Sequence, residues 1–324
     1  MTVTAMYKQF FGLRDNPFNV NPDPRYLLLT PSTQEALAGL TYGIQNRKGI
    51  ILLTGEVGTG KTTLLNKLLD WLRQEQAITA FIFNTQLSVS ELFECLMSEF
   101  EIAGESHTKS DMLSRLNRWL LDRYRSGEAV VLVLDEAQNL SPQLLEEVRL
   151  LTNLETTTEK LLQIVLSGQP ELEEKLKHPQ LRQLRQRITV RCRTNPLSLA
   201  ETHCYIAERL RIAGATGEPV FSPEAVESVF NYARGIPRVT NVLCEHSLIN
   251  AFVLEQRPVQ ASLIDEVARE FELDYIAPTV REEEPERPMA SESLLQALQA
   301  IVGSLQRGLR QSVSVAAESH ERKA

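Results

Sequence analysis

Residues 55–62 of this chain read Gly-Glu-Val-Gly-Thr-Gly-Lys-Thr and fit the phosphate-binding pattern G-x-x-x-x-G-K-[ST]. The preceding apolar run, residues 50–54, has the composition of a buried strand, and leucines at helical spacing follow from Leu64 onward. Glycines in such a loop let backbone N–H groups turn inward, and the start of the helix adds unpaired N–H groups. The sequence therefore predicts a strand, a triphosphate-binding loop and a helix in this order.

Each residue type in the loop has an expected task. Lys61 would reach the β- and γ-phosphates, and the Thr62 hydroxyl would ligate Mg²⁺. The expected ligands are ATP and Mg²⁺. The residues predicted to bind the nucleotide are Gly55, Glu56, Val57, Gly58, Thr59, Gly60, Lys61, Thr62, Thr63 and Asp135.

An acidic pair, Asp135-Glu136, follows the continuously apolar run 129–134. Such a run is typical of a strand buried on both faces, and its carboxyl end faces the crevice where parallel sheets bind ligands. Asp135 would hold Mg²⁺ through water, and Glu136 would orient and deprotonate the attacking water. The alternative is a solvated strand end. We interpret the pair as the mark of a hydrolase, with the triphosphate held where two adjacent parallel strands end.

The run 161–167 predicts another strand, which ends in Ser167-Gly168-Gln169. If this strand neighbours the one before Asp135, Ser167 or Gln169 would lie near the γ-phosphate and hold the water in line. The alternative is simple capping of the next helix. Of the two residues, we favour Gln169.

Three arginines, Arg182, Arg185 and Arg187, are more than a single-chain site needs. A guanidinium inserted beside the γ-phosphate of a neighbouring subunit is worth about 10³–10⁵ in rate. Arg185 and Arg187 are the favoured candidates for this role. The alternative is a solvated helix end whose arginines pair with Glu171, Glu173 and Glu174.

A fourth arginine, Arg238, follows Gly235-Ile236-Pro237 at the expected start of a helix. It could reach back to the γ-phosphate and report the nucleotide state to a following domain. The alternative is a surface arginine.

Strand-like and helix-like segments alternate up to residue 195, which predicts an α/β fold: a parallel sheet flanked by helices. The expected strands are 50–54, 78–83, 129–134, 161–167 and 188–192, and the expected helices are 60–75, 88–103, 109–126, 141–154 and 170–186. From Pro196 the pattern is helical only, at 198–213, 222–233, 237–254 and 260–271. This predicts a small all-helical lid domain.

The expected domains are an N-terminal arm and helix (1–48), a P-loop ATPase core (49–195), the lid (196–274), a flexible linker (275–290) and a short amphipathic helix with a tail (291–316). The last helix would be weakly held, or would dock on a partner or a membrane.

The arm, residues 1–31, is expected to be irregular, because three prolines fall within residues 17–24. It could fold across the site and contact the base, with Tyr7 and Phe18 as candidates, or it could be a plain packing arm. Ser32 or Thr33 would then cap a helix that runs to Asn46.

Composition and charge favour some classes of function over others. The formal net charge is −8, which gives no reason to expect nucleic-acid binding. Four cysteines show no C-x-x-C spacing, so we expect reduced thiols. Neither a signal peptide nor an apolar run of about 18 residues is evident. The expected location is cytoplasmic with no membrane span, and recruitment to the inner face of the membrane stays open.

One motif is misleading. Thr108-Lys109-Ser110-Asp111 matches a guanine-selective T-K-x-D pattern, but it lies between the two phosphate-site motifs rather than after both. We interpret it as a helix cap and favour ATP over GTP.

Taken together, the chain resembles AAA+ ATPases, and more closely those of the ExeA/GspA type, over about residues 6–272. The resemblance rests on the segments 7–11, 16–18, 22–26, 55–62, 134–139, 167–170, 184–188 and 235–238. It implies Walker A at 55–62, Walker B at 131–136, sensor 1 at Gln169, sensor 2 at Arg238 and an arginine finger among Arg182, Arg185 and Arg187.

Three functions remain open on the sequence. The first is an assembly or remodelling ATPase for a secretion, pilus or polysaccharide-export apparatus, acting as a homo-oligomeric ring or nucleotide-dependent dimer with a protein partner in an envelope complex. The second is a DNA-binding transposition-regulator ATPase of the TniB/TnsC kind, with a basic track along 182–193; the acidic charge ranks it second. The third is a nucleotide switch that recruits a partner through 291–310.

Overall fold

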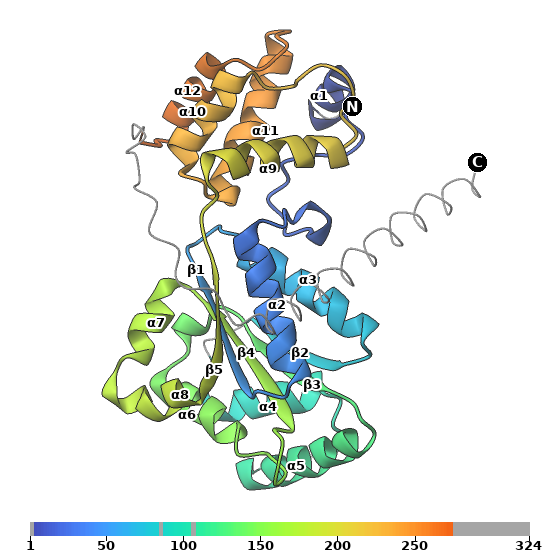
Figure 1. Cartoon of the computed structure of the whole chain (residues 1–324), viewed down its shortest axis with the longest axis vertical. Helices are drawn as coiled ribbons and strands as arrows, with labels where there is room; N and C mark the ends of the chain where they lie inside the picture. Colours follow the sequence, from blue (N-terminus) through green and yellow to red (C-terminus); the bar gives the residue numbers. More distant parts are fainter. Residues whose placement is uncertain (1–2, 84–86, 105–107, 275–324) are drawn as a thin grey trace, which may run out of the picture.

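The structure is a computed structural model that describes residues 3–83, 87–104 and 108–274. An α/β part carries a single sheet between layers of helices, and a helical part lies beyond one end of that sheet (Figure 1). The predicted linker (275–290) and the C-terminal helix with its tail (291–316) lie outside the described residues.

The sheet has five parallel strands in the order β2-β3-β4-β1-β5. They are β1 (Ile50–Gly55), β2 (Ile78–Ile82), β3 (Val130–Leu134), β4 (Leu162–Gly168) and β5 (Ile188–Thr194). All five predicted strands are confirmed within two residues at either end. The expectation that the strands before the phosphate loop and before Asp135 are adjacent is wrong, because β4 lies between β1 and β3.

Helices cover both faces of this sheet, as predicted (Figure 1). Alternation along β1 shows why: Ile50 and Leu52 enter the apolar cluster under one helical layer, while Ile51 and Leu53 enter the cluster on the opposite face. The helices are α2 (Pro31–Gln45), α3 (Lys61–Gln74), α4 (Val89–Glu99), α5 (Lys109–Arg125), α6 (Pro142–Leu151), α7 (Pro170–Leu176) and α8 (Arg182–Arg187).

The cap of α2 differs from the prediction. The Thr30 side chain, not Ser32 or Thr33, accepts a hydrogen bond from the main-chain N–H of Thr33. Pro31 explains the shift, because proline at the first helical position lacks only an N–H that would be unpaired anyway.

The helical part contains α9 (Leu199–Ile212), α10 (Pro223–Ala233), α11 (Pro237–Val253) and α12 (Ala261–Glu270). They agree with the four predicted lid helices. The proposed boundary between residues 195 and 196 falls between the end of β5 and the start of α9, and it remains a prediction. Among the described residues, none of the helices has the length and apolar character needed to traverse a bilayer.

The N-terminal segment corrects the prediction of an irregular arm. Residues Val3–Phe11 form a helix, α1, which packs on the helical part and not on the sheet (Figure 1). Tyr7 and Phe11 stand one helical turn apart and are both buried in the apolar cluster of the lid. Phe18 joins the same cluster and packs edge-to-face against Phe221. Burial of the Tyr7 and Phe11 side chains stabilises the helix, and the helix-breaking prolines lie further along the arm.

Candidate nucleotide-binding site

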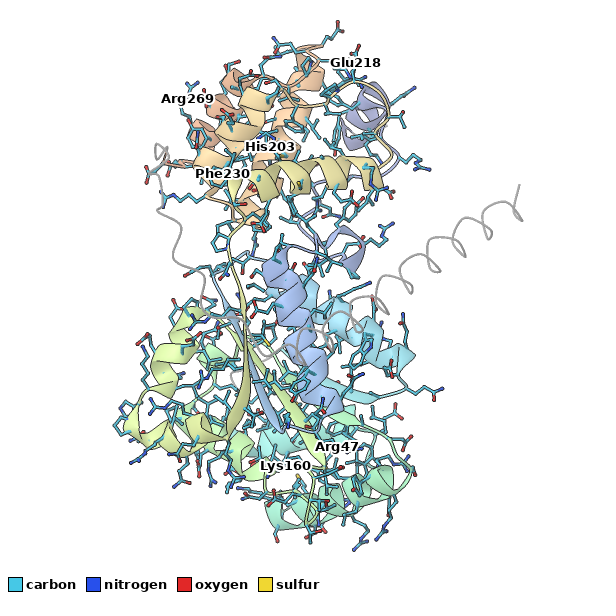
Figure 2. All side chains as sticks on the ribbon, in the orientation of Figure 1. Arg47, Lys160, His203, Glu218, Phe230 and Arg269 are labelled. Carbon is cyan, nitrogen blue, oxygen red and sulfur yellow. The ribbon has the colours of Figure 1, made fainter. Side chains whose placement is uncertain are left out.

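A cavity of about 330 Å³ lies where the sheet meets the helical part. The α/β end with Arg47 and Lys160 lies away from the helical part with His203 and Glu218 (Figure 2), and the cavity is between these ends. Four parts of the chain line it: the arm (Val20, Asn21, Pro22, Asp23), the phosphate loop and α3 (Val57, Gly58, Gly60, Lys61, Thr62, Thr63), two strand ends (Glu136, Gln169) and the lid (Tyr205, Arg209, Pro237, Arg238, Asn241).

The phosphate loop joins β1 to α3 with the predicted glycine geometry. Gly58 and Gly60 have φ values of 81° and 96°, in the left-handed region that glycine adopts without strain. The Thr59 hydroxyl lies 2.8 Å from the hydroxyl of Thr194 at the end of β5 and donates to the Glu56 carbonyl. The loop is thereby fixed between two strand ends.

Lys61 lies inside this loop with its side chain buried. Its Nζ donates to the carbonyls of Gly55, at 2.7 Å, and of Glu56, at 2.9 Å. Burial lowers the pKa of Lys61, and nearby carboxylates oppose that shift; they belong to Glu136, Asp135, Glu56 and Glu171. The lysine and the acidic pair therefore share one electrostatic environment, as the two motifs predict.

The acidic pair ends β3 and is held by the neighbouring strand. Asp135 Oδ1 accepts from the Ser167 hydroxyl at 2.7 Å and from the main-chain N–H of Glu136 at 2.9 Å. These bonds fix the carboxylate and leave Oδ2 free of protein donors within the described residues. Asp135 is near enough to Lys61 to influence its pKa, but it is buried and does not line the cavity. A carboxylate oxygen is a ligand type that suits Mg²⁺.

Glu136 has a positive φ of 51°, which is uncommon for a residue with a side chain and typical of active sites. Its Oε2 accepts from Gln169 Nε2 at 3.2 Å and from Gln138 Nε2. Strands β3 and β4 are neighbours, as the Gln169 hypothesis required. Ser167 contacts Asp135 instead, so each polar residue of this strand end contacts one member of the acidic pair.

Gln138 is a residue of this site that the sequence analysis does not predict. It lies in a short 3₁₀ turn, Ala137–Asn139, and touches both Glu136 and Gln169. Its place two residues after the acidic pair was the available signal. Tyr205, Arg209 and Asn241 of the lid were missed too, because only the tertiary structure brings them to the cavity.

The arm also reaches the cavity, but through residues 20–23. The two aromatic candidates for base contact, Tyr7 and Phe18, are buried in the lid cluster and do not line the cavity. Of the two alternatives for these aromatic residues, packing against the lid is therefore the one that the structure supports.

Arg238 lies in the first turn of α11 and lines the cavity. Its main-chain N–H donates to the carbonyl of Gly58 at 3.2 Å. The lid helix is thus joined directly to the phosphate loop.

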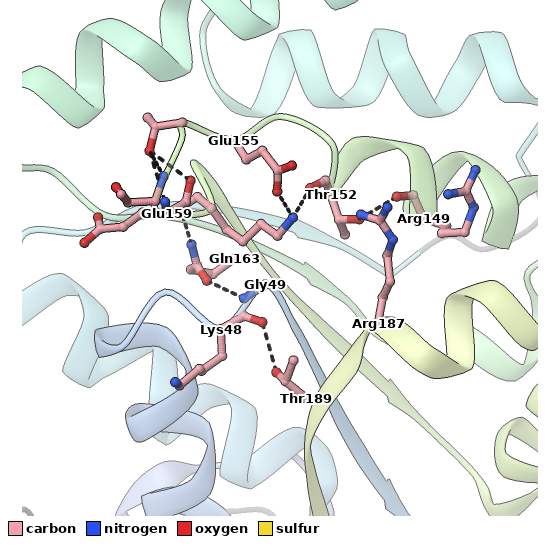
Figure 3. Close-up of polar contacts among 12 residues, drawn as sticks. Lys48, Gly49, Arg149, Thr152, Glu155, Glu159, Gln163, Arg187 and Thr189 are labelled. Carbon is pink, nitrogen blue, oxygen red and sulfur yellow. Dashed lines mark hydrogen bonds and ion pairs between the residues drawn. The ribbon is translucent and has the colours of Figure 1, made fainter.

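The three remaining arginines lie at the opposite end of the sheet. A strand rises about 3.3 Å per residue, so the start of β5, next to Arg187, is roughly 20 Å from Thr194 at the phosphate loop. Arg187 donates to the Thr152 hydroxyl at 2.7 Å (Figure 3), while Arg182 and Arg185 are exposed. Glu173 and Glu174 pair with Arg193 and Lys177 instead, contrary to the alternative reading.

The T-K-x-D stretch is a helix cap, as predicted. The Thr108 side chain accepts from the main-chain N–H of Asp111 at the start of α5. The four cysteines are all free.

Comparison with known proteins agrees with this geometry. Residues 44–176 match the AAA domain family. The chain is 46% identical over 248 residues to general secretion pathway protein A of Aeromonas hydrophila, which covers 76% of this chain and 45% of that protein. The chain therefore spans less than half the length of this relative.

Solved structures share the fold at low sequence identity. Cdc6p of Pyrobaculum aerophilum has a TM-score of 0.62 at 18% identity, over 80% of this chain and 71% of that chain. The ORC2 protein of Aeropyrum pernix has a TM-score of 0.59 at 16% identity, over 81% and 72%. The Drosophila ORC bound to DNA gives 0.61 at 15% identity, over 97% and 84%. The matched AAA domain and the sequence identity to general secretion pathway protein A identify this chain as an AAA+ protein of the ExeA/GspA type, and the solved structures share its fold.

Proposed function

We propose that the chain binds Mg²⁺–ATP in the cavity and splits the γ-phosphate with water activated by Glu136. One observation carries this proposal: Glu136 and Gln169, from the ends of adjacent strands, meet at 3.2 Å beside the loop that holds Lys61. A carboxylate and an amide at this place can orient one water, and positioning is most of what phosphoryl transfer requires.

The remaining residues divide the other tasks. Lys61 and the main-chain N–H groups of residues 58–63 bind the phosphates. Thr62 and Asp135 would hold Mg²⁺, which neutralises charge that develops on the phosphate oxygens when bound. Arg238 contacts the γ-phosphate and couples the lid to it, since its helix already rests on Gly58.

Completion of the site requires a second copy of the chain. Arg187 directly precedes β5, whose other end at Thr194, beside the phosphate loop, is roughly 20 Å away by strand rise, and Arg182 and Arg185 lie in the same short helix, α8. At that distance they act only in a neighbouring subunit, which is why we propose a homo-oligomer, as a ring or a nucleotide-dependent dimer.

The biological role follows from the similarity to general secretion pathway protein A. We place the chain as an assembly or remodelling ATPase for a secretion, pilus or polysaccharide-export apparatus, acting on the cytoplasmic side of the membrane with a protein partner of that apparatus. In the proposed domain division, the core (49–195) carries out ATP hydrolysis. The lid (196–274) responds to the nucleotide state.

The test compares ATP turnover and ATP binding in two variants. Lys61→Ala should weaken ATP binding, because the ammonium that contacts the β- and γ-phosphates is lost. Glu136→Gln should bind ATP as tightly as wild type but turn over at least about 10²-fold more slowly, since only the general base is removed. Glu94→Gln, an exposed carboxylate on α4, is the matched control.

Two results would contradict the proposal. Wild-type turnover in Glu136→Gln would remove the assigned base, and unchanged ATP binding in Lys61→Ala would remove the site. Turnover per subunit that does not depend on protein concentration would argue against the oligomer. Stimulation of turnover by double-stranded DNA at low salt would instead favour the DNA-binding alternative.

A further inference from the structure

The side-chain amide of Gln138 forms hydrogen bonds with both residues that are proposed to orient the attacking water, Glu136 and Gln169. Its Nε2 donates to Glu136 Oε2, and its Oε1 accepts from the main-chain N–H of Gln169 at 3.1 Å. Gln169 Nε2 donates to the same Glu136 oxygen. The three residues therefore form a closed ring of hydrogen bonds across the ends of β3 and β4.

The position of Gln138 is itself fixed from outside this ring. Lys175 of α7 donates from Nζ to the carbonyls of Gln138, at 2.5 Å, and of Leu140, at 2.8 Å. Gly168 permits the approach from the other side, because a Cβ at that position would lie only 2.8 Å from Gln138 Oε1.

The turn does not need the Gln138 side chain to form. Main-chain bonds from Asn139 to Glu136 and from Leu140 to Ala137 close it, and the Lys175 contacts go to carbonyl oxygens. The side-chain amide is thus left for the contacts with Glu136 and Gln169. A residue held only for packing would not require a donor and an acceptor at these two points.

We propose that Gln138 is a positioning residue for ATP hydrolysis. Its amide sets the separation and orientation of the Glu136 carboxylate and the Gln169 amide, so that both can hold one water in line with the γ-phosphate. This inference rests on the proposed function. The bond that breaks and the proton that moves to Glu136 are those of hydrolysis by water; Gln138 itself exchanges no proton.

Two substitutions at Gln138 test the two hydrogen bonds of its amide. Gln138→Met keeps the length of the side chain and loses both hydrogen bonds. Gln138→Glu keeps the acceptor for the Gln169 N–H and places a carboxylate against Glu136. Both should lower kcat by about 10²-fold, the cost of small misplacements at a reacting centre, while the Kd for ATP stays within about twofold of wild type. Gln143→Met and Gln143→Glu, at an exposed glutamine of α6, are the matched controls.

A double variant tests whether the ring acts as a unit. Gln138→Met combined with Gln169→Met should lose no more activity than the more damaging single change, because groups that act together are not additive. Independent, multiplying losses would overturn the inference. So would a fall in kcat accompanied by an equal loss of ATP affinity or by a lower unfolding midpoint.

The role of Gln138 and the proposed function can be refuted separately. Wild-type kcat in both Gln138 variants, with Glu136→Gln inactive, overturns the role of Gln138 and leaves the proposed function intact. Wild-type kcat in Glu136→Gln overturns the proposed function and, with it, the assignment of Gln138.

Discussion

The main-chain N–H of Arg238 donates to the carbonyl of Gly58 at 3.2 Å, so the first turn of α11 rests on the phosphate loop. The two segments are packed closely at Gly58, because a Cβ there would lie 2.8 Å from Arg238 Cβ and 2.9 Å from Ile236 Cγ2. The phosphate loop and the lid are therefore in direct contact at Gly58.

Gly58→Ala should damage both stability and nucleotide binding. The backbone cost of a left-handed φ of 81° is about 1–2 kcal/mol for a residue with a Cβ, and the added methyl also displaces Arg238. We expect ATP affinity to fall at least about tenfold, because the loop N–H groups move. Isothermal titration and thermal unfolding measure the two effects.

The control for this change is Gly127→Ala. Gly127 has a φ of 78°, and a Cβ there would meet nothing within 4 Å. The Gly127→Ala variant should lose a similar amount of stability through backbone strain and keep wild-type ATP affinity. Equal ATP affinities in the two variants would show that contact between Gly58 and the lid does not affect binding.

Arg209 ties the arm to the lid. The buried guanidinium donates to the carbonyls of Pro17 and Asn19 and to the Tyr205 hydroxyl, and its Cζ lies 4.5 Å from the centroid of the Tyr26 ring. Lysine cannot reproduce this planar set of donors.

Arg209→Lys should leave buried carbonyls unpaired and lower the free energy of unfolding by about 1–3 kcal/mol. Residues 20–23 of the arm line the cavity, so ATP affinity should fall and protease cleavage in this stretch should increase. Arg211→Lys, an exposed arginine on the same helix, should change neither. A protease cleavage pattern like that of wild type would show that Arg209 does not hold the arm against the lid.

We expect the junction of α1 with the lid to be sensitive to pH through Glu245, which accepts hydrogen bonds from Tyr7 and Asn16. Burial raises the pKa of Glu245, and hydrogen bonds from Tyr7 and Asn16 oppose the shift in part. Because the folded pKa lies above the unfolded one, the stabilising contribution is fully present below the unfolded value and is lost as pH rises through the folded value.

Glu245→Gln should therefore flatten this dependence. The unfolding midpoint of wild type should fall relative to that of Glu245→Gln as the pH rises above about 4.3, the ordinary pKa of a glutamate, and the buried carboxyl loses its proton. Glu227→Gln, at an exposed position of α10, should follow wild type throughout. A constant difference between wild type and Glu245→Gln across this range would show that Glu245 does not cause the effect.

The arginines at the amino end of the sheet should act between subunits. Either Arg185→Ala or Arg187→Ala should lower turnover by about 10³-fold or more without weakening ATP binding. Mixing that variant with Lys61→Ala should restore activity, because each protein supplies what the other lacks. Arg118→Ala, at an exposed site on α5, serves as the control.

No recovery in the mixture, for each arginine in turn, would contradict action in trans. Arg187→Ala also removes the bond to Thr152 (Figure 3), so its unfolding midpoint must be compared with that of wild type.

The fold and the phosphate site could be predicted closely because their signals are local. Residues 55–62 carry the loop, Asp135-Glu136 follows an apolar strand directly, and α6 begins within one residue of the expected position. Each depends on neighbouring residues along the chain, where backbone geometry fixes what can touch. The α1 helix was missed although Tyr7 and Phe11 have helical spacing, because the nearby prolines of the arm were given more weight.

By itself, the sequence determined the chemistry of this protein: a phosphate loop, an acidic pair and a parallel sheet to hold them. The tertiary structure alone decided that β4 separates β1 from β3, that Gln138 joins Glu136 to Gln169, and that the arm belongs to the lid. These relationships depend on which strand pairs with which and on how buried side chains pack. Neither is encoded in the spacing of neighbouring residues, because many strand orders satisfy the same local pattern.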